Sequence, residues 1–177
     1  VVAVTSVAFS RGVTGLVPAT TYYFCAIGRN NYGTTFGTVL SFTTLANPPV
    51  VNTSTATLLT GTTAQLNGSA NPGGAATTGW FRYASASPGT CNDSFGTRAP
   101  AAGGSALGSG TSNVAFLQGI TGLTAGTTYY YCAIASNSAG TAVGSVLSFT
   151  TLANAPTVST SSLPSGCTKA MAVTASA

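Results

Sequence analysis

Charge is the scarcest property of this 177-residue sequence. It contains no histidine and a single acidic residue, Asp93, and 3% of its residues are charged, against a usual share of about 25%. One carboxylate cannot supply the pair that glycoside hydrolysis needs, and without histidine no imidazole can activate a serine or cysteine nucleophile. Metal sites need several carboxylates or clustered cysteine and histidine. We therefore expect no enzyme activity, no metal and no cofactor.

The positive charges are few and scattered, and the sequence also lacks a long apolar run. The net charge of +4 forms no cluster, which argues against nucleic-acid binding, and no apolar stretch approaches the roughly 18 residues that a membrane span requires. We interpret the charges as isolated and solvated. They lie at Arg11, Arg29, Arg82, Arg98 and Lys169.

One stretch of the sequence occurs twice. Gly12 to Thr44 reads GVTGLVPATTYYFCAIGRNNYGTTFGTVLSFTT, and Gly119 to Thr151 reads GITGLTAGTTYYYCAIASNSAGTAVGSVLSFTT. The cysteines set the offset at 107 residues (132 − 25), and matching residues keep that offset without a gap. A constant offset of this size indicates a repeat of whole domains.

The repeated stretch has the pattern of a β-hairpin. The run from Thr128 to Ala135 is rich in aromatic and β-compatible residues and alternates between two faces, with Tyr131 on one and Cys132 on the other. Turn residues follow from Asn137 to Gly140, and a second strand returns to Thr151. The pattern predicts an all-β fold.

The spacing of several hairpin residues resembles the F and G strands of a fibronectin type III domain, in the Thr-, Ser- and Gly-rich version found in bacterial surface proteins. Leu123 is followed six positions later by Tyr129, and then by Gly140, Gly144 and Phe149. The resemblance implies an immunoglobulin-like β-sandwich with a tyrosine corner at Tyr129 and, in the earlier copy, at Tyr22. Leu66 stands where many members have a strand B tryptophan.

The repeat predicts tandem sandwiches, one complete domain between two partial ones. Residues 1–44 would supply strands E, F and G of a first domain, residues 45–151 a whole domain, and residues 152–177 strands A and B of a third. The partial domains leave open edges. Either the covalent chain continues, or separate chains complete one another by strand addition.

Alternation within the complete domain also predicts which residues form its core. In the strand from Thr78 to Tyr83, we expect Phe81 and Tyr83 to face the core, and Trp80 and Arg82 to lie on an open face. The region from 84 to 110 is irregular in sequence, and we expect loops and one short strand there.

The four cysteines suggest an extracellular or cell-surface location. We predict a disulfide between Cys91 and Cys132, because the loop after the strand from Thr78 to Tyr83 returns toward the strand that carries Cys132. By the same reasoning Cys25 would pair with the residue equivalent to Cys91, but that position would precede Val1. Cys167 aligns with Thr60 of the complete domain and so has no equivalent cysteine there. Both would pair outside this segment or with another chain.

Sugar attachment and sugar binding are two further possibilities. Asn-x-Ser/Thr sequons occur at Asn52, Asn67 and Asn92, although most such matches in a polar β protein arise by chance. Outward aromatic residues could form a sugar-stacking platform, but aromatics on a sheet surface more often pair across strands. These aromatics are Trp80, Tyr130, Tyr23 and Tyr32.

Two functions fit these observations. The first is a structural, non-catalytic extracellular repeat protein, which forms or decorates a surface filament, stalk or adhesive fibre by packing against copies of itself. We favour this function because low charge reduces repulsion between neighbours. The second is a carbohydrate-binding or spacer module of a secreted enzyme or adhesin, with cell-surface polysaccharide as its partner.

Overall fold

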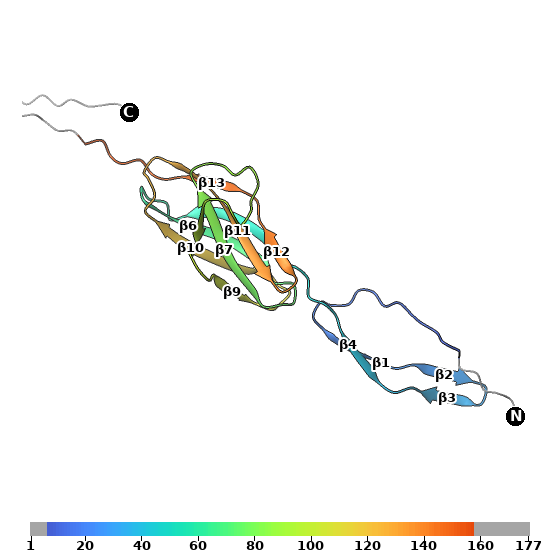
Figure 1. Cartoon of the computed structure of the whole chain (residues 1–177). Helices are drawn as coiled ribbons and strands as arrows, with labels where there is room; N and C mark the ends of the chain where they lie inside the picture. The colour runs from blue at the N-terminus through green and yellow to red at the C-terminus, as the bar shows by residue number, and fades with distance from the viewer. Residues whose placement is uncertain (1–6, 158–177) are drawn as a thin grey trace, which may run out of the picture.

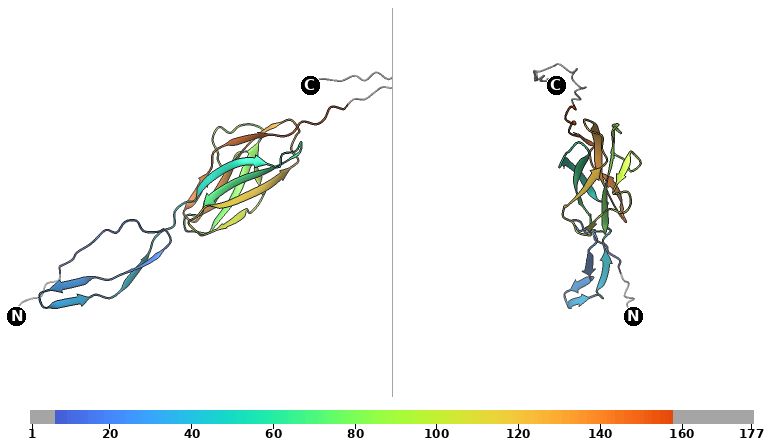
Figure 2. Two further views of the ribbon diagram at one scale, coloured as in Figure 1. Left: turned by 180° about the vertical axis from the view of Figure 1, so that it is seen from behind. Right: turned by 90° about the vertical axis from the view of Figure 1, so that its left-hand side faces the viewer.

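The computed structural model describes residues 7–157, and that part of the chain contains strands and no helix. It consists of two lobes that lie end to end, and β1 to β4 belong to the first and β5 to β13 to the second (Figures 1 and 2). We call residues 7–44 the first repeat and residues 45–151 the second repeat. No helix long and apolar enough to cross a membrane occurs among the described residues.

The first repeat holds two short antiparallel ribbons in succession. β1 (Thr21–Phe24) pairs with β4 (Leu40–Thr43), and β2 (Ile27–Asn30) pairs with β3 (Gly33–Phe36). Residues 7–20 form no strand, although the sequence predicts a strand E there. In the second repeat the corresponding strand pairs with β6, and the first repeat has no described counterpart of β6. A strand without a neighbour has no ladder to join.

The second repeat is a sandwich of two sheets. One sheet has the order β10-β6-β5, with β5 (Val50–Thr57), β6 (Thr63–Asn71) and β10 (Val114–Thr121). The other is built on β11 (Thr128–Asn137) and β7 (Thr77–Ala84). Its shorter strands are β8 (Thr97–Ala99) and β9 (Ser105–Gly108) on β7, and β12 (Gly140–Val143) and β13 (Leu147–Thr150) on β11.

The core of the second repeat lies between these two sheets. In β6 every second residue is buried, as expected for a strand with one face against a core. Leu66 and Phe81 are fully enclosed, and the ring centroids of Phe81 and Phe116 lie 4.9 Å apart. The other main core side chains are Leu107, Ile120, Leu123, Tyr131, Ala133 and Phe149. The all-β, sandwich-like class predicted from the sequence is therefore present.

The start of the second repeat, which follows the first repeat directly, is held by the side chain of Asn137 and by one backbone hydrogen bond. The amide nitrogen of Asn137 donates to the carbonyl oxygens of Asn47 and Pro72, at 2.9 and 2.8 Å. The backbone of Asn47 also donates to the Gly73 carbonyl at 2.8 Å. Gly73 has a φ of +70°, and a Cβ there would collide with the Asn47 carbonyl, so this turn requires glycine.

Candidate functional site: an uncovered sheet face in the first repeat

The tyrosine corner has the same geometry in both repeats. Val17 donates its backbone N–H to the hydroxyl of Tyr22 at 2.9 Å, and Thr124 donates to the hydroxyl of Tyr129 at 3.0 Å. Both tyrosines implied by the family resemblance therefore anchor the chain that enters their hairpin.

The returning strand is also held alike in the two repeats. Gly37 donates its N–H to Ala26 at 2.8 Å, and Gly144 donates to Ala133 at the same distance. Because these bonds join residues within one hairpin, the hairpin sequence alone is sufficient to place them.

Burial separates the two repeats. Phe9 is 74% exposed whereas its counterpart Phe116 is 5% exposed, and Phe24 is 51% exposed whereas Tyr131 is fully buried. The difference arises because β5, β6 and β10 cover the inner face of the second hairpin, whereas no described strand covers that of the first. The first repeat therefore presents an apolar face that the second repeat uses as core.

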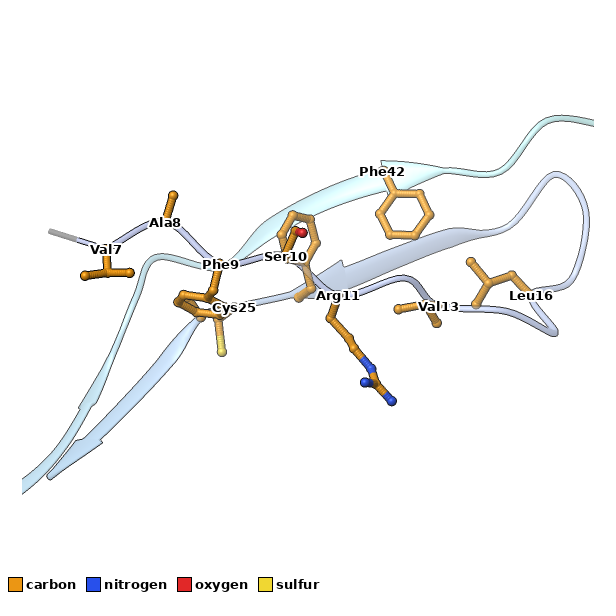
Figure 3. A pocket seen from close by; sticks show the side chains of 11 residues that line it. Val7, Ala8, Phe9, Ser10, Arg11, Val13, Leu16, Cys25 and Phe42 are labelled. Atoms are coloured by element: carbon orange, nitrogen blue, oxygen red, sulfur yellow. The ribbon is translucent and has the colours of Figure 1, made fainter.

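The uncovered face forms a groove with a volume of about 730 Å³. Phe42 stacks on Tyr22 at 5.9 Å and meets Phe24 edge-on at 6.1 Å, which makes an aromatic floor. Figure 3 shows the segment from Val7 to Leu16 running along the same groove. The apolar side chains that line it are Val7, Phe9, Val13, Leu16, Phe24 and Phe42.

The first hairpin also has an open edge. In the second repeat, β11 pairs with β7 from Tyr130 to Ser136, on the side away from β12 and β13. Among the described residues, β1 pairs only with β4, and β2 only with β3. Unpaired strand edges are templates for adding another strand. The edge that corresponds to the β7-binding edge is thus free from Tyr23 to Arg29.

The strand that carries the cysteine is continuous in the second repeat and interrupted in the first. β11 runs unbroken through Cys132 and Ala133, and the buried hydroxyl of Thr53 accepts a hydrogen bond from the Ala133 N–H at 3.0 Å. In the first repeat, Cys25 and Ala26 separate β1 from β2. No described residue of the first repeat corresponds to Thr53. The strand of the first repeat is therefore interrupted at the position where, in the second repeat, Thr53 of the other sheet contacts β11.

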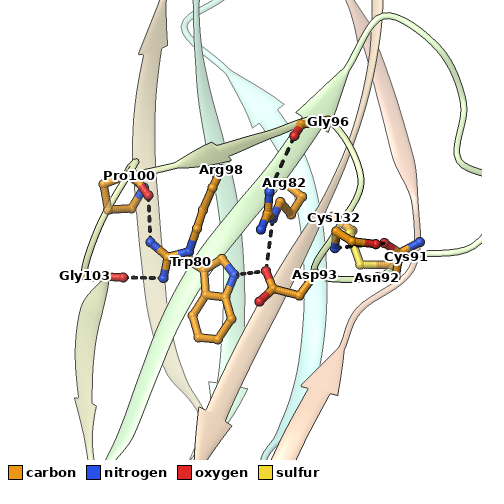
Figure 4. Close-up of polar contacts among 11 residues, drawn as sticks. Trp80, Arg82, Cys91, Asn92, Asp93, Gly96, Arg98, Pro100, Gly103 and Cys132 are labelled. Atoms are coloured by element: carbon orange, nitrogen blue, oxygen red, sulfur yellow. Dashed lines mark hydrogen bonds and ion pairs between the residues drawn. A yellow bond between two sulfur atoms is a disulfide. The ribbon is translucent and has the colours of Figure 1, made fainter.

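The outer face of the second hairpin is covered by a loop. Cys91 and Cys132 form a disulfide with an S–S distance of 1.90 Å, which ties the segment after β7 onto β11 (Figure 4). Trp80 is 7% exposed, and Cys132 and Ile134 are fully buried in a small second core with Phe95. The prediction that Trp80 lies on an open face was wrong, because the irregular sequence after β7 folds back over that face.

Three of the six charged side chains gather around Trp80, which corrects the interpretation of isolated, solvated charges. The carboxylate of Asp93 accepts hydrogen bonds from the indole N–H of Trp80 at 2.7 Å and from Nε of Arg82 at 3.0 Å. The guanidinium of Arg98 lies 4.6 Å from the Trp80 ring centroid, in a cation–π contact (Figure 4). The sequence missed this cluster because its members come from β7, the loop and β8.

The cluster holds the loop in place. Arg98 donates to the carbonyls of Pro100 and Gly103, and Arg82 reaches the carbonyl of Gly96. Partial burial of Asp93 disfavours its charge, but the bonds from Trp80 and Arg82 and the charges of both arginines outweigh that effect and lower its pKa. Every buried polar side-chain atom of the described residues has a hydrogen-bond partner.

Tyr131 is the other group with a shifted pKa. Burial raises the pKa of its phenol, although a backbone hydrogen bond at Ala56 opposes the shift. Its hydroxyl donates to the carbonyl of Ser54 at 2.6 Å and joins the two sheets. The role of Tyr131 is therefore structural.

The three sequons lie in different surroundings. Asn52 and Asn92 are exposed, and the Asn92 side chain accepts hydrogen bonds from Ser94 beside the disulfide. The amide nitrogen of Asn67 donates to Thr55 at 2.8 Å, so attachment of a glycan there would break a contact between β5 and β6. Cys167 lies outside the described residues.

The four aromatic residues expected to form a sugar-stacking platform do not share one surface. Trp80 is buried and Tyr130 half-buried in the second repeat, whereas Tyr23 and Tyr32 are exposed on the first. Aromatic residues on separate lobes cannot stack on one sugar ring.

No family model and no curated protein matches this chain. Similar solved structures are sensor domains of the anti-sigma factor RsgI4 in Pseudobacteroides cellulosolvens. The short form is 20% identical, with a TM-score of 0.43, and covers 61% of this chain and 98% of that chain. A solution structure is 16% identical, with a TM-score of 0.40, and covers 69% and 91% respectively.

These neighbours correct the function expected from the sequence. They are named as sensor domains of an anti-sigma factor, and none is named as a filament protein or a carbohydrate-binding module. The expectation of a surface filament, stalk or adhesive fibre was therefore wrong, and so was the alternative of a carbohydrate-binding or spacer module. The filament was inferred from low charge and from the sequence repeat. These two properties describe the surface and the architecture of a protein, and they do not specify its function.

Proposed function

We propose that this chain is a non-catalytic, extracellular recognition module that binds a polypeptide segment as its partner, from the same chain or from a separate one, on the uncovered face and open edge of the first repeat. The observation that carries the proposal is internal to the chain: residues that line the groove in the first repeat are core residues in the second. The proposal rests on this comparison and not on the solved structures. We also interpret the two repeats as fibronectin type III-like.

The second repeat indicates which structural elements the bound polypeptide must supply. There, β7 pairs antiparallel with the edge of β11, and β5 and β6 lie over its apolar face. The partner would therefore supply a strand at the edge of β1 and β2, and alternate apolar side chains over Phe24 and Phe42. Main-chain hydrogen bonds provide affinity in this mode, and side-chain pockets provide specificity.

The partner polypeptide needs little charge. Among the described residues, Arg11 is the only charged one that lines the groove, and the remaining lining is mostly aliphatic and aromatic. Burial of apolar area is the main favourable contribution to such an interface, at about 25 cal/mol per Å² of apolar surface. A weakly charged, β-branched and aromatic segment matches this surface, and a highly charged segment would bury unpaired charge.

A synthetic peptide with the sequence of residues 50–84 tests the proposal, because it carries the β5, β6 and β7 patterns. We expect it to shift the amide resonances of ¹⁵N-labelled chain between Thr21 and Phe42. Resonances of the second repeat should stay in place, because its own β5 to β7 occupy the equivalent surface. An unchanged spectrum at saturating peptide would contradict the proposal.

A matched pair of variants locates the interaction. Phe24→Ser removes a ring from the groove and should weaken peptide binding by roughly tenfold or more, since burying such a side chain contributes about 1.5–3 kcal/mol. Tyr32→Ser removes a ring that is 98% exposed and does not line the groove, and should leave the affinity unchanged. Equal affinities for both variants would place the binding surface elsewhere.

A dilution series distinguishes a separate partner from a second copy of this chain. If the same resonances move with protein concentration in the absence of peptide, another copy occupies the groove. That result would replace the separate partner by self-association.

A further inference from the structure

We propose that reduction of the bridge between Cys91 and Cys132 detaches the loop of residues 85–96 from the second repeat, while the sandwich beneath it stays folded. The inference concerns the second repeat alone, and it goes beyond the proposed function, which uses the first. In the oxidised chain the loop lies over the outer face of the sheet built on β7 and β11 (Figure 4). The second repeat therefore contains a redox-sensitive switch between a covered and an uncovered face.

The residues under the loop are packed separately from the main core. Trp80, Cys132 and Ile134 are buried on the outer face of the sheet, where Cys91 and Phe95 of the loop pack against them. The main core lies on the other face of the same sheet and contains no residue of the loop. Successive side chains of a strand point to opposite faces. Departure of the loop therefore exposes the small outer group and leaves the main core intact.

Few contacts other than the bridge hold the loop on the sheet. None of residues 85–96 belongs to a strand. The carboxylate of Asp93 accepts hydrogen bonds from Trp80 and Arg82, and Arg82 also reaches the Gly96 carbonyl at 3.5 Å. Segments with few buried apolar contacts and few backbone hydrogen bonds open at a lower free-energy cost than core strands do. The disulfide is thus the attachment that thermal motion alone does not break.

A dithiol is the class of reductant that opens the bridge. One thiolate of the dithiol attacks the sulfur of Cys91, which is half-buried, and the bond to the fully buried Cys132 breaks. The second thiol of the dithiol then attacks the mixed disulfide, and the dithiol leaves as its own disulfide. Cys91 and Cys132 end as thiols that carry the two protons lost by the dithiol, so one disulfide is consumed and one is formed.

The experiment uses the whole chain with Cys25→Ser and Cys167→Ser, so that the bridge contains the remaining two of its four cysteines. Trp80 is the only tryptophan in the sequence, and quenching of its fluorescence by acrylamide reports whether the loop covers it. We expect dithiothreitol to raise the quenching constant at least about threefold, because the ring is 7% exposed under the closed loop. Amide hydrogen exchange in β6 and β10 should stay slow, and reoxidation should restore the initial quenching constant.

Two variants separate the bridge from the other attachments. Asp93→Ala removes the carboxylate that binds Trp80 and Arg82, and in the oxidised chain it should leave the quenching constant unchanged, because the bridge still holds the loop. Cys91→Ser with Cys132→Ser should have the quenching constant of the reduced chain without any reductant. A rise in the oxidised Asp93→Ala chain would contradict the inference, since the carboxylate and not the bridge would then hold the loop.

Three further results would overturn the inference. Alkylation and mass spectrometry establish that the bridge is reduced, and an unchanged quenching constant in that state would show that the loop stays closed. Fast exchange in β6 and β10 after reduction would show that the whole sandwich unfolds with the loop. A bridge that dithiothreitol leaves intact in the folded chain would show that the Cys91 sulfur is out of reach of a dithiol.

Discussion

Phe9 and Phe116 occupy equivalent positions in two copies of one sequence pattern, yet one is 74% exposed and the other 5%. The tyrosine corners of the same two copies have almost identical hydrogen-bond lengths. Hairpin geometry is therefore local, since it follows from residues within each copy, whereas burial is contributed by strands from elsewhere in the chain. The final two strands of a sandwich can therefore specify their own hairpin geometry, but they cannot specify the burial of their side chains.

The equivalent phenylalanines provide the largest expected contrast. Phe116→Ala should lower the free energy of unfolding of the second repeat by about 3–5 kcal/mol, because it leaves a cavity beside Phe81. Phe9→Ala should change the first repeat by less than about 0.5 kcal/mol, as at other exposed positions. Urea unfolding followed by Trp80 fluorescence measures the second repeat, and amide hydrogen exchange in β1 measures the first. Similar losses for both variants would refute the comparison.

Removing the disulfide should make the second repeat more like the first. Cys91→Ser with Cys132→Ser opens a bridge that spans 41 residues, and we expect a loss of about 2–4 kcal/mol. The midpoint of urea unfolding, read from Trp80, gives the effect. The control is Cys25→Ser, which removes an unbridged thiol and should leave that midpoint in place.

Removal of the hydroxyl from either corner tyrosine should reduce stability by a similar amount in the two repeats, because the corner is local to each hairpin. Tyr22→Phe and Tyr129→Phe each delete one hydrogen bond, and each should cost its own repeat about 0.5–1.5 kcal/mol. Hydrogen exchange of the amides of Val17 and Thr124 reports the loss directly. A far larger loss at Tyr129 would mean that the corner depends on the surrounding sandwich.

The smallest effect should come from Asp93, which has no counterpart among the described residues of the first repeat. Its pKa is lowered in the folded state, so its stabilising contribution is complete above the unfolded pKa of about 3.9 and is lost as pH falls through the lower folded value. The pair with Arg82 is partly exposed, so the contribution is within about 1 kcal/mol. Acid titration of Trp80 fluorescence should show this step in the parent chain. Asp93→Asn should remove it.

Much of the second repeat could be predicted from alternation. Phe81 faces the core as expected, because β7 keeps a regular period of two between Gly79 and Tyr83. The loop that covers Trp80 could not be predicted, since residues 85–96 lack periodicity and their position depends on contacts distant in sequence. The first repeat shows the opposite limit. Its apolar pattern predicts a core, but no described strand covers that face, so the burial of these residues could not be checked against the pattern.

The bridge between Cys91 and Cys132 also has a mechanical consequence. If the chain is pulled from its two ends, the covalent path passes through the disulfide and bypasses the 40 residues between the two cysteines (132 − 91 − 1). At about 3.4 Å per extended residue, roughly 140 Å of contour length stays locked until the bond is reduced. The first repeat has no such bridge among its described residues and would release its full length.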